Sequence, residues 1–264
     1  MSIPPERSAE VVDGRQVFIK HRRDAPAHFF AAEARGLAEL RRAACLRVPE
    51  VYDVQPGRIV LEDLGSGTRG ADYWIRAASG LAEQHRCHGA GFGFTQSGFC
   101  GDSPQDNTPD DDGWRFFAER RLLPQMRRAI DRGLIEKQDA DAIESICSQL
   151  RQRIPDMPAV LLHGDLWLGN LHVCGDGSPA LIDAAAVHYG WAEAELAMLI
   201  LFGSPPEGFF RAYAEHAPLC RDWRARAPIY NLYHLLNHVN LFGAGYIASL
   251  RAALATHARS PRRR

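Results

Sequence analysis

The first 65 positions of the chain contain short apolar runs bounded by turn residues and one stretch of helical spacing. AEVV, the Asp13–Gly14 pair and QVFIK predict a two-strand hairpin, because Asp-Gly supplies the positive φ angles of a tight turn. Apolar residues then recur at helical spacing between Phe29 and Ala44, which predicts an amphipathic helix. VPEVYDV and GRIVLEDL predict two further short strands. We therefore expect a small sheet that carries one helix.

Beyond residue 70 the apolar spacing becomes mostly helical. AVLLHGD and SPALID predict short strands joined through an LHVCGDG turn, and GSGTRG at 65–70 is the best linker candidate. Helices are expected over 73–88, 114–129, 138–154, 192–202, 207–216 and 229–241. The chain is thus predicted to be an α+β protein with two lobes, a β-rich lobe over 1–67 and a larger helical lobe over 68–264.

Composition narrows the class of protein without identifying it. The hydrophobic fraction of 46%, the charged fraction of 24% and the formal charge of -1 are typical of an ordinary globular protein, and they favour neither a nucleic acid nor a membrane as partner. The six cysteines are scattered without a CxxC pair, as in reduced cytoplasmic proteins. The first residues lack the apolar core of a signal peptide, so we expect a cytoplasmic location. The oligomeric state stays open.

The stretch LLHGDLWLGN contains the first candidate chemistry. Asp165 and Asn170 have the spacing D-x-x-x-x-N, with His163 two residues before the aspartate. In kinases such an aspartate accepts or orients the proton of the attacking hydroxyl, and the asparagine holds a magnesium ion. Asp183, 13 residues after Asn170, is placed to provide a second oxygen ligand. Taken alone, the same residues could merely cap a turn.

Two further residues, in the first lobe, make the kinase interpretation stronger. Lys20 ends the predicted strand VFIK, and Glu33 follows 13 residues later on the predicted helix. A kinase needs a strand lysine on the α- and β-phosphates of ATP, steadied by a helix glutamate. Separately these residues would be an edge charge and a solvated helix charge. The order Lys, Glu, HxD-x-x-x-x-N, Asp matches the kinase order throughout.

The segment LEDLGSG lies where the two predicted lobes join. There the backbone of Glu62, Asp63 and Leu64 could present groups to an adenine ring. A strand end followed by a linker explains the same residues equally well, and both descriptions can hold.

Longer strings of the sequence resemble a known family. LLHGDLWLGN, PALID, GWRFFAERRLLPQM and APIYNLYHLLNHVNLFGAGY closely resemble the fructosamine kinase (ketosamine-3-kinase) family. The resemblance implies a bilobal protein-kinase-like fold and transfer of the ATP γ-phosphate to a sugar hydroxyl of ketoamines, the adducts of sugars with amines. Such phosphorylation leads to repair of glycation.

The resemblance also implies roles for the motif residues. Asp165 would be the base, Asn170 and Asp183 would hold Mg²⁺, and Lys20 with Glu33 would form the nucleotide pair. Trp167 matches the tryptophan beside the base, and its face suits a sugar ring. His163 is expected beside the substrate together with Trp167.

The chain also departs from the family. Only 19 residues precede Lys20, with Gly14 as their sole glycine, so we expect a shortened first lobe without the first strand and the Gly-rich loop. Such a lobe would lose backbone N–H groups that neutralise phosphate charge, and the resulting hypothesis is weak nucleotide binding. Two alternatives stay open: a non-catalytic pseudokinase, and a kinase for an aminoglycoside or choline.

One other pair of residues could suggest a metal. His234 and His238 are spaced i, i+4 in HLLNH, but no glutamate lies between them and their flanks are apolar. We interpret them as buried, hydrogen-bonded histidines that line the helical lobe, where the substrate cleft could touch them.

Overall fold

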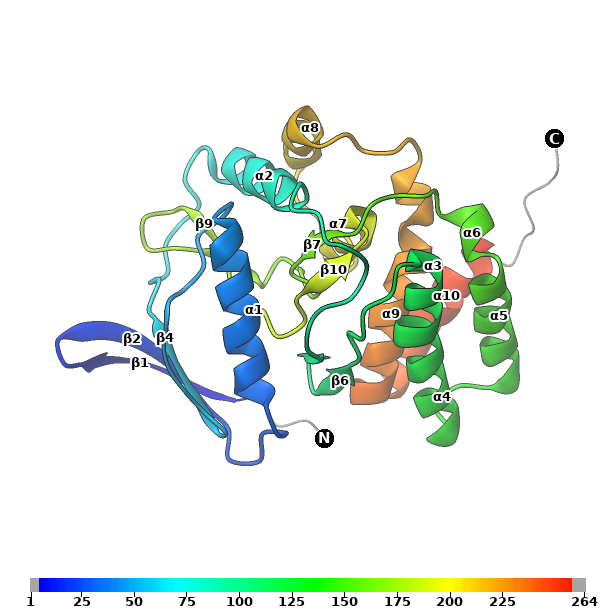
Figure 1. The fold of residues 1–264 in the computed structure, drawn as a ribbon, viewed down its shortest axis with the longest axis horizontal. Coiled ribbons are helices and arrows are strands. Elements are labelled where there is room, and N and C mark those ends of the chain that lie inside the picture. The colour runs from blue at the N-terminus through cyan, green and yellow to red at the C-terminus, as the bar shows by residue number, and fades with distance from the viewer. Residues whose placement is uncertain (1–4, 258–264) are drawn as a thin grey trace.

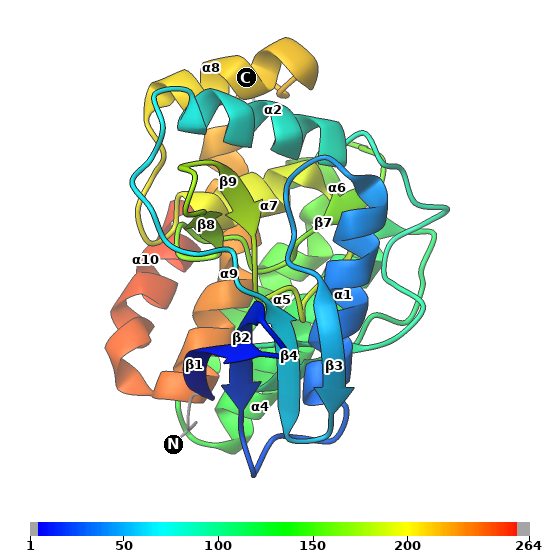
Figure 2. The same cartoon turned by 90° about the vertical axis from the view of Figure 1, so that its left-hand side faces the viewer.

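The first part of the chain forms a twisted sheet with one helix against it. The computed structural model describes residues 5–257. Among these residues, four antiparallel strands form one sheet in the order β1-β2-β4-β3 (Figure 2). Their bounds are β1 (Glu6–Val12), β2 (Arg15–His21), β3 (Val51–Gln55) and β4 (Arg58–Glu62). The predicted hairpin is confirmed, and its turn residues Asp13 and Gly14 have φ angles of 50° and 77°.

Helix α1 (Phe29–Ala43) lies between this sheet and the rest of the molecule (Figure 1). Its apolar face buries Phe30, Leu37 and Leu40, as the spacing predicts. Gly36 is required at the contact with the second lobe, because a Cβ atom there would lie 1.8 Å from the carbonyl oxygen of Ala184. The backbone of α1 therefore packs directly on the segment that follows Asp183.

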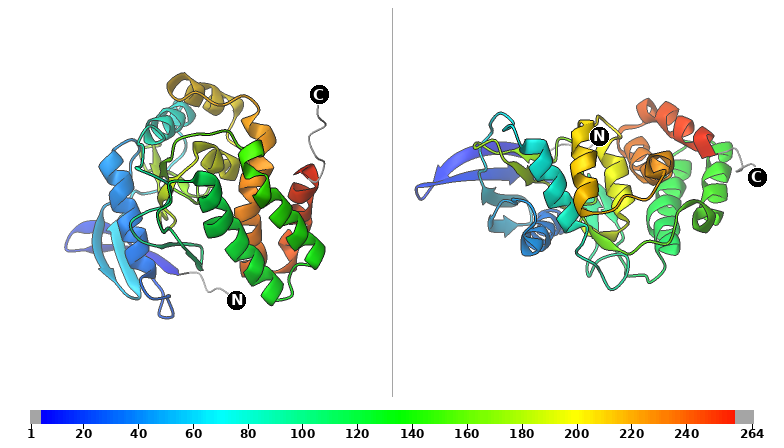
Figure 3. Two further views of the ribbon diagram at one scale, coloured as in Figure 1. Left: turned by 45° about the vertical axis from the view of Figure 1, so that its right-hand side comes forward. Right: turned by 90° about the horizontal axis from the view of Figure 1, so that it is seen from above.

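The second part is mainly helical. Residues 63–70, which include the whole predicted linker at 65–70, carry neither helix nor strand, and the lobe boundary at residue 67 stays a prediction. The helices are α2 (Tyr73–Gln84), α3 (Gly113–Phe116), α4 (Leu123–Asp131), α5 (Lys137–Ser148), α6 (Leu150–Arg153), α7 (Ala192–Leu199), α8 (Glu207–His216), α9 (Trp223–Phe242) and α10 (Ile247–His257). Figure 3 shows α4, α5, α9 and α10 on the side away from the β1–β2 hairpin, whereas α2 lies nearer to it. No helix among residues 5–257 is long and apolar enough to cross a membrane.

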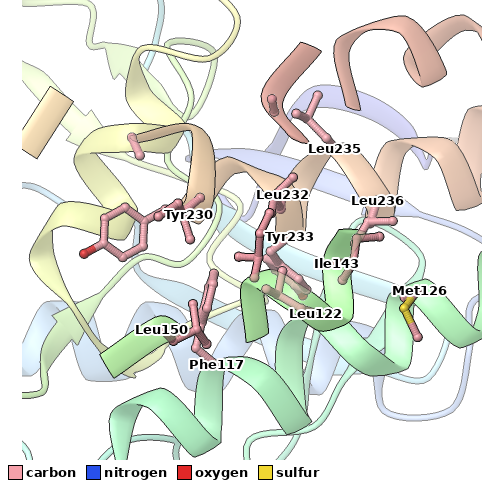
Figure 4. Packing of buried hydrophobic residues seen from close by; sticks show 14 of the residues in the cluster. Phe117, Leu122, Met126, Ile143, Leu150, Tyr230, Leu232, Tyr233, Leu235 and Leu236 are labelled. Atoms are coloured by element: carbon pink, nitrogen blue, oxygen red, sulfur yellow. The ribbon is translucent and has the colours of Figure 1, made fainter. Parts of the chain in front are cut away.

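The core of the helical part forms around α9. Buried residues of α9 pack against α4, α5 and the π-helical turn η1 (Phe117–Leu122), which joins α3 to α4 (Figure 4). The helix starts at Trp223, six residues before the predicted start. The predicted start is too late because the charged residues and Pro228 in WRARAP interrupt the apolar pattern, although Trp223 and Ala227 are buried.

Short strands carry the segments that the sequence analysis singled out. β7 (Val160–Leu162) pairs with β10 (His188–Gly190), and β8 (Leu171–Val173) pairs with β9 (Pro179–Leu181). The prediction of an LHVCGDG turn was therefore wrong for its first three residues, which are strand β8. The turn itself is shorter, since the N–H of Cys174 donates to the carbonyl of Ser178 at 2.9 Å. A further hairpin, β5 (Gly98–Cys100) with β6 (Ser103–Gln105), lies between the helices expected over 73–88 and 114–129.

Candidate active site

The loop after β7 is held by a buried carboxylate. Glu195 on α7 accepts hydrogen bonds from the backbone N–H groups of His163 and Gly164 at 3.1 and 2.9 Å. His85 lies 3.1 Å from the same carboxylate. Burial alone would raise the pKa of Glu195, but the hydrogen bonds from His85 and from the Gly164 backbone outweigh it and hold that pKa below its usual value. The buried Glu195 carboxylate thus holds the backbone at the start of the loop in place.

His163 is part of this support and does not face the cleft. Its side chain is fully buried, its Nε2 lies 2.7 Å from the carbonyl oxygen of Ile182, and its Nδ1 accepts the Asp165 N–H at 3.3 Å. One tautomer, with the proton on Nε2, satisfies both contacts. The predicted substrate contact of His163 is therefore not supported by its position. The ring instead ties the loop to the segment that carries Asp183.

Asp165 and Asn170 lie at the two ends of a tight turn. The side-chain N–H of Asn170 donates to the Asp165 carbonyl at 2.8 Å, which leaves the Asn170 Oδ1 as its remaining polar atom. The carbonyl of Asn170 accepts the N–H of Ile182 at 3.2 Å, so Asp183 follows directly beside it. Burial, reinforced by the carboxylates of Asp183 and Glu195, raises the pKa of Asp165 to about 6.

Lys20, Glu33 and Asp183 form one network of charges. The Lys20 ammonium donates to the carboxylates of both Glu33 and Asp183, although Lys20 and Asp183 are 163 residues apart in the sequence. The side chains of Lys20 and Glu33 are each 5% exposed, whereas that of Asp183 is 25% exposed. Burial alone would raise the pKa of Asp183, but Lys20 and Arg7 outweigh it and hold that pKa below its usual value. Asp183 therefore presents a carboxylate to the cleft.

Two hollows meet at this network. One, of about 480 Å³, is lined by Phe18, by residues 61–66 and by His172. The other, of about 1110 Å³, is lined by Asp165, Trp167 and Asn170, among others. The site residues expected from the sequence thus line one continuous cleft, with the exception of His163.

Glu62, Asp63 and Leu64 line the first hollow and differ in which of their polar groups are already hydrogen-bonded. The carboxylate of Glu62 accepts from Arg47 at 2.9 Å, and that of Asp63 accepts the Gly65 N–H at 2.8 Å, so both are used within the protein. The carbonyl of Leu64 accepts the Gly175 N–H at 2.9 Å. Among residues 5–257, the N–H of Leu64 donates to no hydrogen-bond acceptor. That N–H is the group of this segment that a ligand could use.

Comparison with known proteins agrees with this geometry. The family model for fructosamine kinase matches residues 7–259. The chain belongs to the fructosamine kinase family.

Individual members of this fructosamine kinase family resemble the chain over most of its length. A probable ketoamine kinase from Synechocystis is 38% identical, over 89% of this chain and 81% of the relative. The ketosamine-3-kinase of Mus musculus is 33% identical, over 90% of this chain and 86% of the relative. A crystal structure of a fructosamine-3-kinase homologue from Thermobifida fusca has a TM-score of 0.88 and 35% identity, over 98% of this chain and 94% of that one.

The kinase-like fold extends beyond the family. An aminoglycoside phosphotransferase has a TM-score of 0.62 at 16% identity, which shows a shared fold alone. The predicted bilobal, protein-kinase-like α+β fold is therefore confirmed.

Two residues at the site, Arg7 and Glu195, were not predicted from the sequence. Arg7 donates to Asp183 at 3.1 Å. The position of Arg7 could have been predicted from the hairpin register, because a turn at 13–14 pairs residue 7 with residue 20. Glu195 could have been noticed as a carboxylate between apolar residues in AEAELAML, but its partners come from distant segments.

The two histidines of HLLNH contact different groups. His234 Nδ1 lies 3.8 Å from an Asp165 carboxylate oxygen and 3.8 Å from Cys100 Sγ, and burial lowers the pKa of His234 to about 3. The ring of His238 stacks on Phe202 with centroids 4.8 Å apart, and burial lowers its pKa to about 4. A neutral, buried His234 ring thus lies next to the Asp165 carboxylate.

Proposed function

We propose that this protein transfers the γ-phosphate of ATP to a sugar hydroxyl of a ketoamine. The observation that carries the proposal is the convergence of Lys20, Glu33 and Asp183 with Asp165 and Asn170 on one cleft. Lys20 and Glu33 come from the sheet lobe, Asp165 and Asn170 from the loop after β7, and Asp183 from the segment after β9. Each has the chemistry that its position requires.

Asp165 would act as the base. The acceptor oxygen forms a bond to the γ-phosphorus, the bond from that phosphorus to the β-phosphate oxygen breaks, and the hydroxyl proton passes to the Asp165 carboxylate while ADP leaves. A pKa of about 6 supports this role, because the carboxylate is then mostly ionised at neutral pH and still a better proton acceptor than an ordinary aspartate.

Asn170 and Asp183 would hold Mg²⁺. The donor set fits the ion, since Mg²⁺ prefers hard oxygen ligands and usually keeps waters and substrate phosphates in its other positions. The hydrogen bond from the Asn170 amide leaves Oδ1 for this purpose, and the Asp183 carboxylate is partly exposed beside it. When bound, the ion would neutralise charge on the transferring phosphate.

Lys20, held by Glu33, would bind the α- and β-phosphates. The adenine ring would occupy the smaller hollow between Phe18 and Leu64, with the N–H of Leu64 as hydrogen-bond donor. The hypothesis of weak nucleotide binding stays a prediction, and calorimetry with ATP tests it directly: a micromolar dissociation constant would contradict it.

Trp167 would contact the acceptor. Trp167 is 44% exposed and lines the same hollow as Phe29, Phe99 and Phe242. An exposed aromatic face beside the base is suited to pack on a sugar ring, and the apolar neighbours suit the carbon chain of the amine carrier.

The competing functions receive less support. A pseudokinase would not need these five charged and polar residues from both lobes to line one cleft. The proposal of an aminoglycoside or choline acceptor is supported only by proteins that share the fold at 16% identity.

An acceptor panel tests the proposal. ADP release is measured with fructose-lysine, ribulose-lysine, kanamycin and choline at fixed MgATP. We expect turnover with a ketoamine and background rates with the others. Turnover confined to kanamycin or choline would move the assignment to a related kinase, and ATP binding without turnover on any acceptor would favour the pseudokinase.

A further inference from the structure

The outer strand of the sheet directs a second cation into the nucleotide cleft. In the register of β1 and β2, Arg7 lies directly opposite Lys20. Residues paired in this way project their side chains from the same face of an antiparallel sheet. Since Lys20 faces the cleft, so does Arg7. Ala9 opposite Phe18 continues the same face towards the turn.

The partner of Arg7 is the proposed metal ligand. Its guanidinium donates to one carboxylate oxygen of Asp183 at 3.1 Å, while Lys20 donates to the other. The Arg7 side chain is 51% exposed and that of Lys20 is 5% exposed. A half-exposed pair is weak and easily exchanged, because water solvates both partners when they separate. The Arg7 contact is therefore the replaceable one of the two.

Arg7 lies where the two hollows of the cleft join. Residues that line both are Arg7, Lys20, Ile182 and Asp183. A nucleotide with its base in the smaller hollow and its terminal phosphate near Asp165 must pass its phosphates between these residues. Two of the four, Lys20 and Arg7, carry positive charge.

We propose that Arg7 is a phosphate-binding residue that rests on Asp183 in the absence of nucleotide and turns to the phosphate oxygens when MgATP binds. The inference rests on the proposed ATP site and adds a residue to it. An Asp183 carboxylate that binds a metal ion gives up part of its pairing with cations, and Arg7 is the cation free to move. A guanidinium can then donate two parallel hydrogen bonds to a phosphate, which the Lys20 ammonium cannot do.

Calorimetry on three hairpin variants tests the inference. Arg7→Ala removes the group, Arg7→Lys keeps its charge without the two-pronged donor, and Arg15→Ala removes an equal charge from the same hairpin, where Arg15 instead lies over the Tyr52 ring at 5.8 Å. The dissociation constants of MgATP and of adenosine, which lacks phosphates, are measured for each. Thermal unfolding of each variant shows that the fold is retained.

We expect Arg7→Ala to weaken MgATP binding by about tenfold, Arg7→Lys to recover part of the loss, and Arg15→Ala to change binding by less than about twofold. Adenosine binding is expected to be equal in all variants. The loss from Arg7→Ala should be smaller for ATP without Mg²⁺, because Asp183 then still holds Arg7.

Three outcomes overturn the inference. An unchanged MgATP constant in Arg7→Ala removes the phosphate contact, and a tighter one makes Arg7 a competitor for Asp183. Equal weakening by Arg7→Ala and Arg15→Ala leaves only a general charge effect. Failure of the wild-type protein to bind MgATP at all would instead contradict the proposed function on which the inference rests.

Discussion

The two sides of the cleft are held in different ways. On the sheet side, the charged side chain of Lys20 pairs directly with Glu33 and also with Asp183 of the second lobe. On the loop side, Asp165 makes few side-chain contacts of its own, and its position is set by Glu195 and His163, which bind the backbone around it.

This difference suggests a division of labour. Side-chain pairs on the sheet side can exchange partners when phosphates and a metal ion bind. The pairs observed here are therefore those of the protein without ligand. Backbone hydrogen bonds on the loop side keep Asp165 in place whether or not a ligand is bound. Substitutions on the sheet side should therefore change nucleotide affinity, whereas those on the loop side should change stability and rate.

The largest effect is expected from Asp165→Asn. The substitution keeps the shape of the side chain but removes the proton acceptor, so kcat should fall by about 10² to 10⁴-fold. The MgATP dissociation constant should stay within about twofold, since Asp165 is not a nucleotide contact. Asp141→Asn, an exposed aspartate of α5, is the matched control in the same steady-state assay. A variant with near-normal kcat would rule out Asp165 as the base.

Removal of the buried support should cost stability. Glu195→Ala leaves the N–H groups of His163 and Gly164 without their acceptor and should lower the free energy of unfolding by about 3 to 5 kcal/mol in urea denaturation. Glu207→Ala, an exposed glutamate of α8, should change it by less than about 1 kcal/mol. Equal urea midpoints for the two variants would show that Glu195 does not hold the loop.

The raised pKa of Asp165 predicts a pH-dependent gain in stability for Asp165→Asn. A folded-state pKa of about 6 against an ordinary 3.8 means that the ionised carboxylate destabilises the folded protein above pH 6 and that this cost vanishes below pH 4. Without nucleotide or metal, Asn should therefore stabilise the protein at pH 8 by up to about 3 kcal/mol, less as far as solvent screens the carboxylate, and not at all near pH 4. Urea unfolding at both pH values measures the difference; an equal effect at both would contradict the pKa shift.

The smallest of these effects is expected on the sheet side. Glu33→Gln keeps the volume of the side chain, and Lys20 keeps Asp183 as a charged partner. The MgATP dissociation constant should rise by about tenfold, because Lys20 is less firmly placed. The free energy of unfolding should change by less than about 1 kcal/mol, because the substitution leaves no buried charge without a charged partner. Calorimetry and urea unfolding measure the two quantities. A large loss of stability with unchanged affinity would reverse the comparison between the two sides.

The sequence was informative where one local motif carries one function. Lys20, Glu33, Asp165, Asn170 and Asp183 each lie in a short recognisable string, and their order along the chain was enough to predict that they meet. The sheet, its hairpin and α1 were predictable for a similar reason, because their apolar spacing and turn residues act locally.

Contacts between distant segments were not predictable in this way. Nothing near His163 indicates that its ring points to Ile182 rather than into the cleft. Strand β8 depends on its partner β9, so its residues alone predict a turn. Glu195 supports residues 31 and 32 positions away in the sequence, and Arg7 meets Asp183 across 176. These are tertiary contacts that leave no periodic signal.

The central claim is that Asp165 and the sheet-side network together deliver the ATP phosphate to a ketoamine hydroxyl. The most direct test is the ³¹P NMR spectrum of the wild-type protein incubated with MgATP and ribulose-lysine or fructose-lysine. We predict a new phosphate monoester signal on the ketoamine that grows in step with ADP. Growth of inorganic phosphate and ADP with no such ester, or no consumption of ATP at all, would contradict the account.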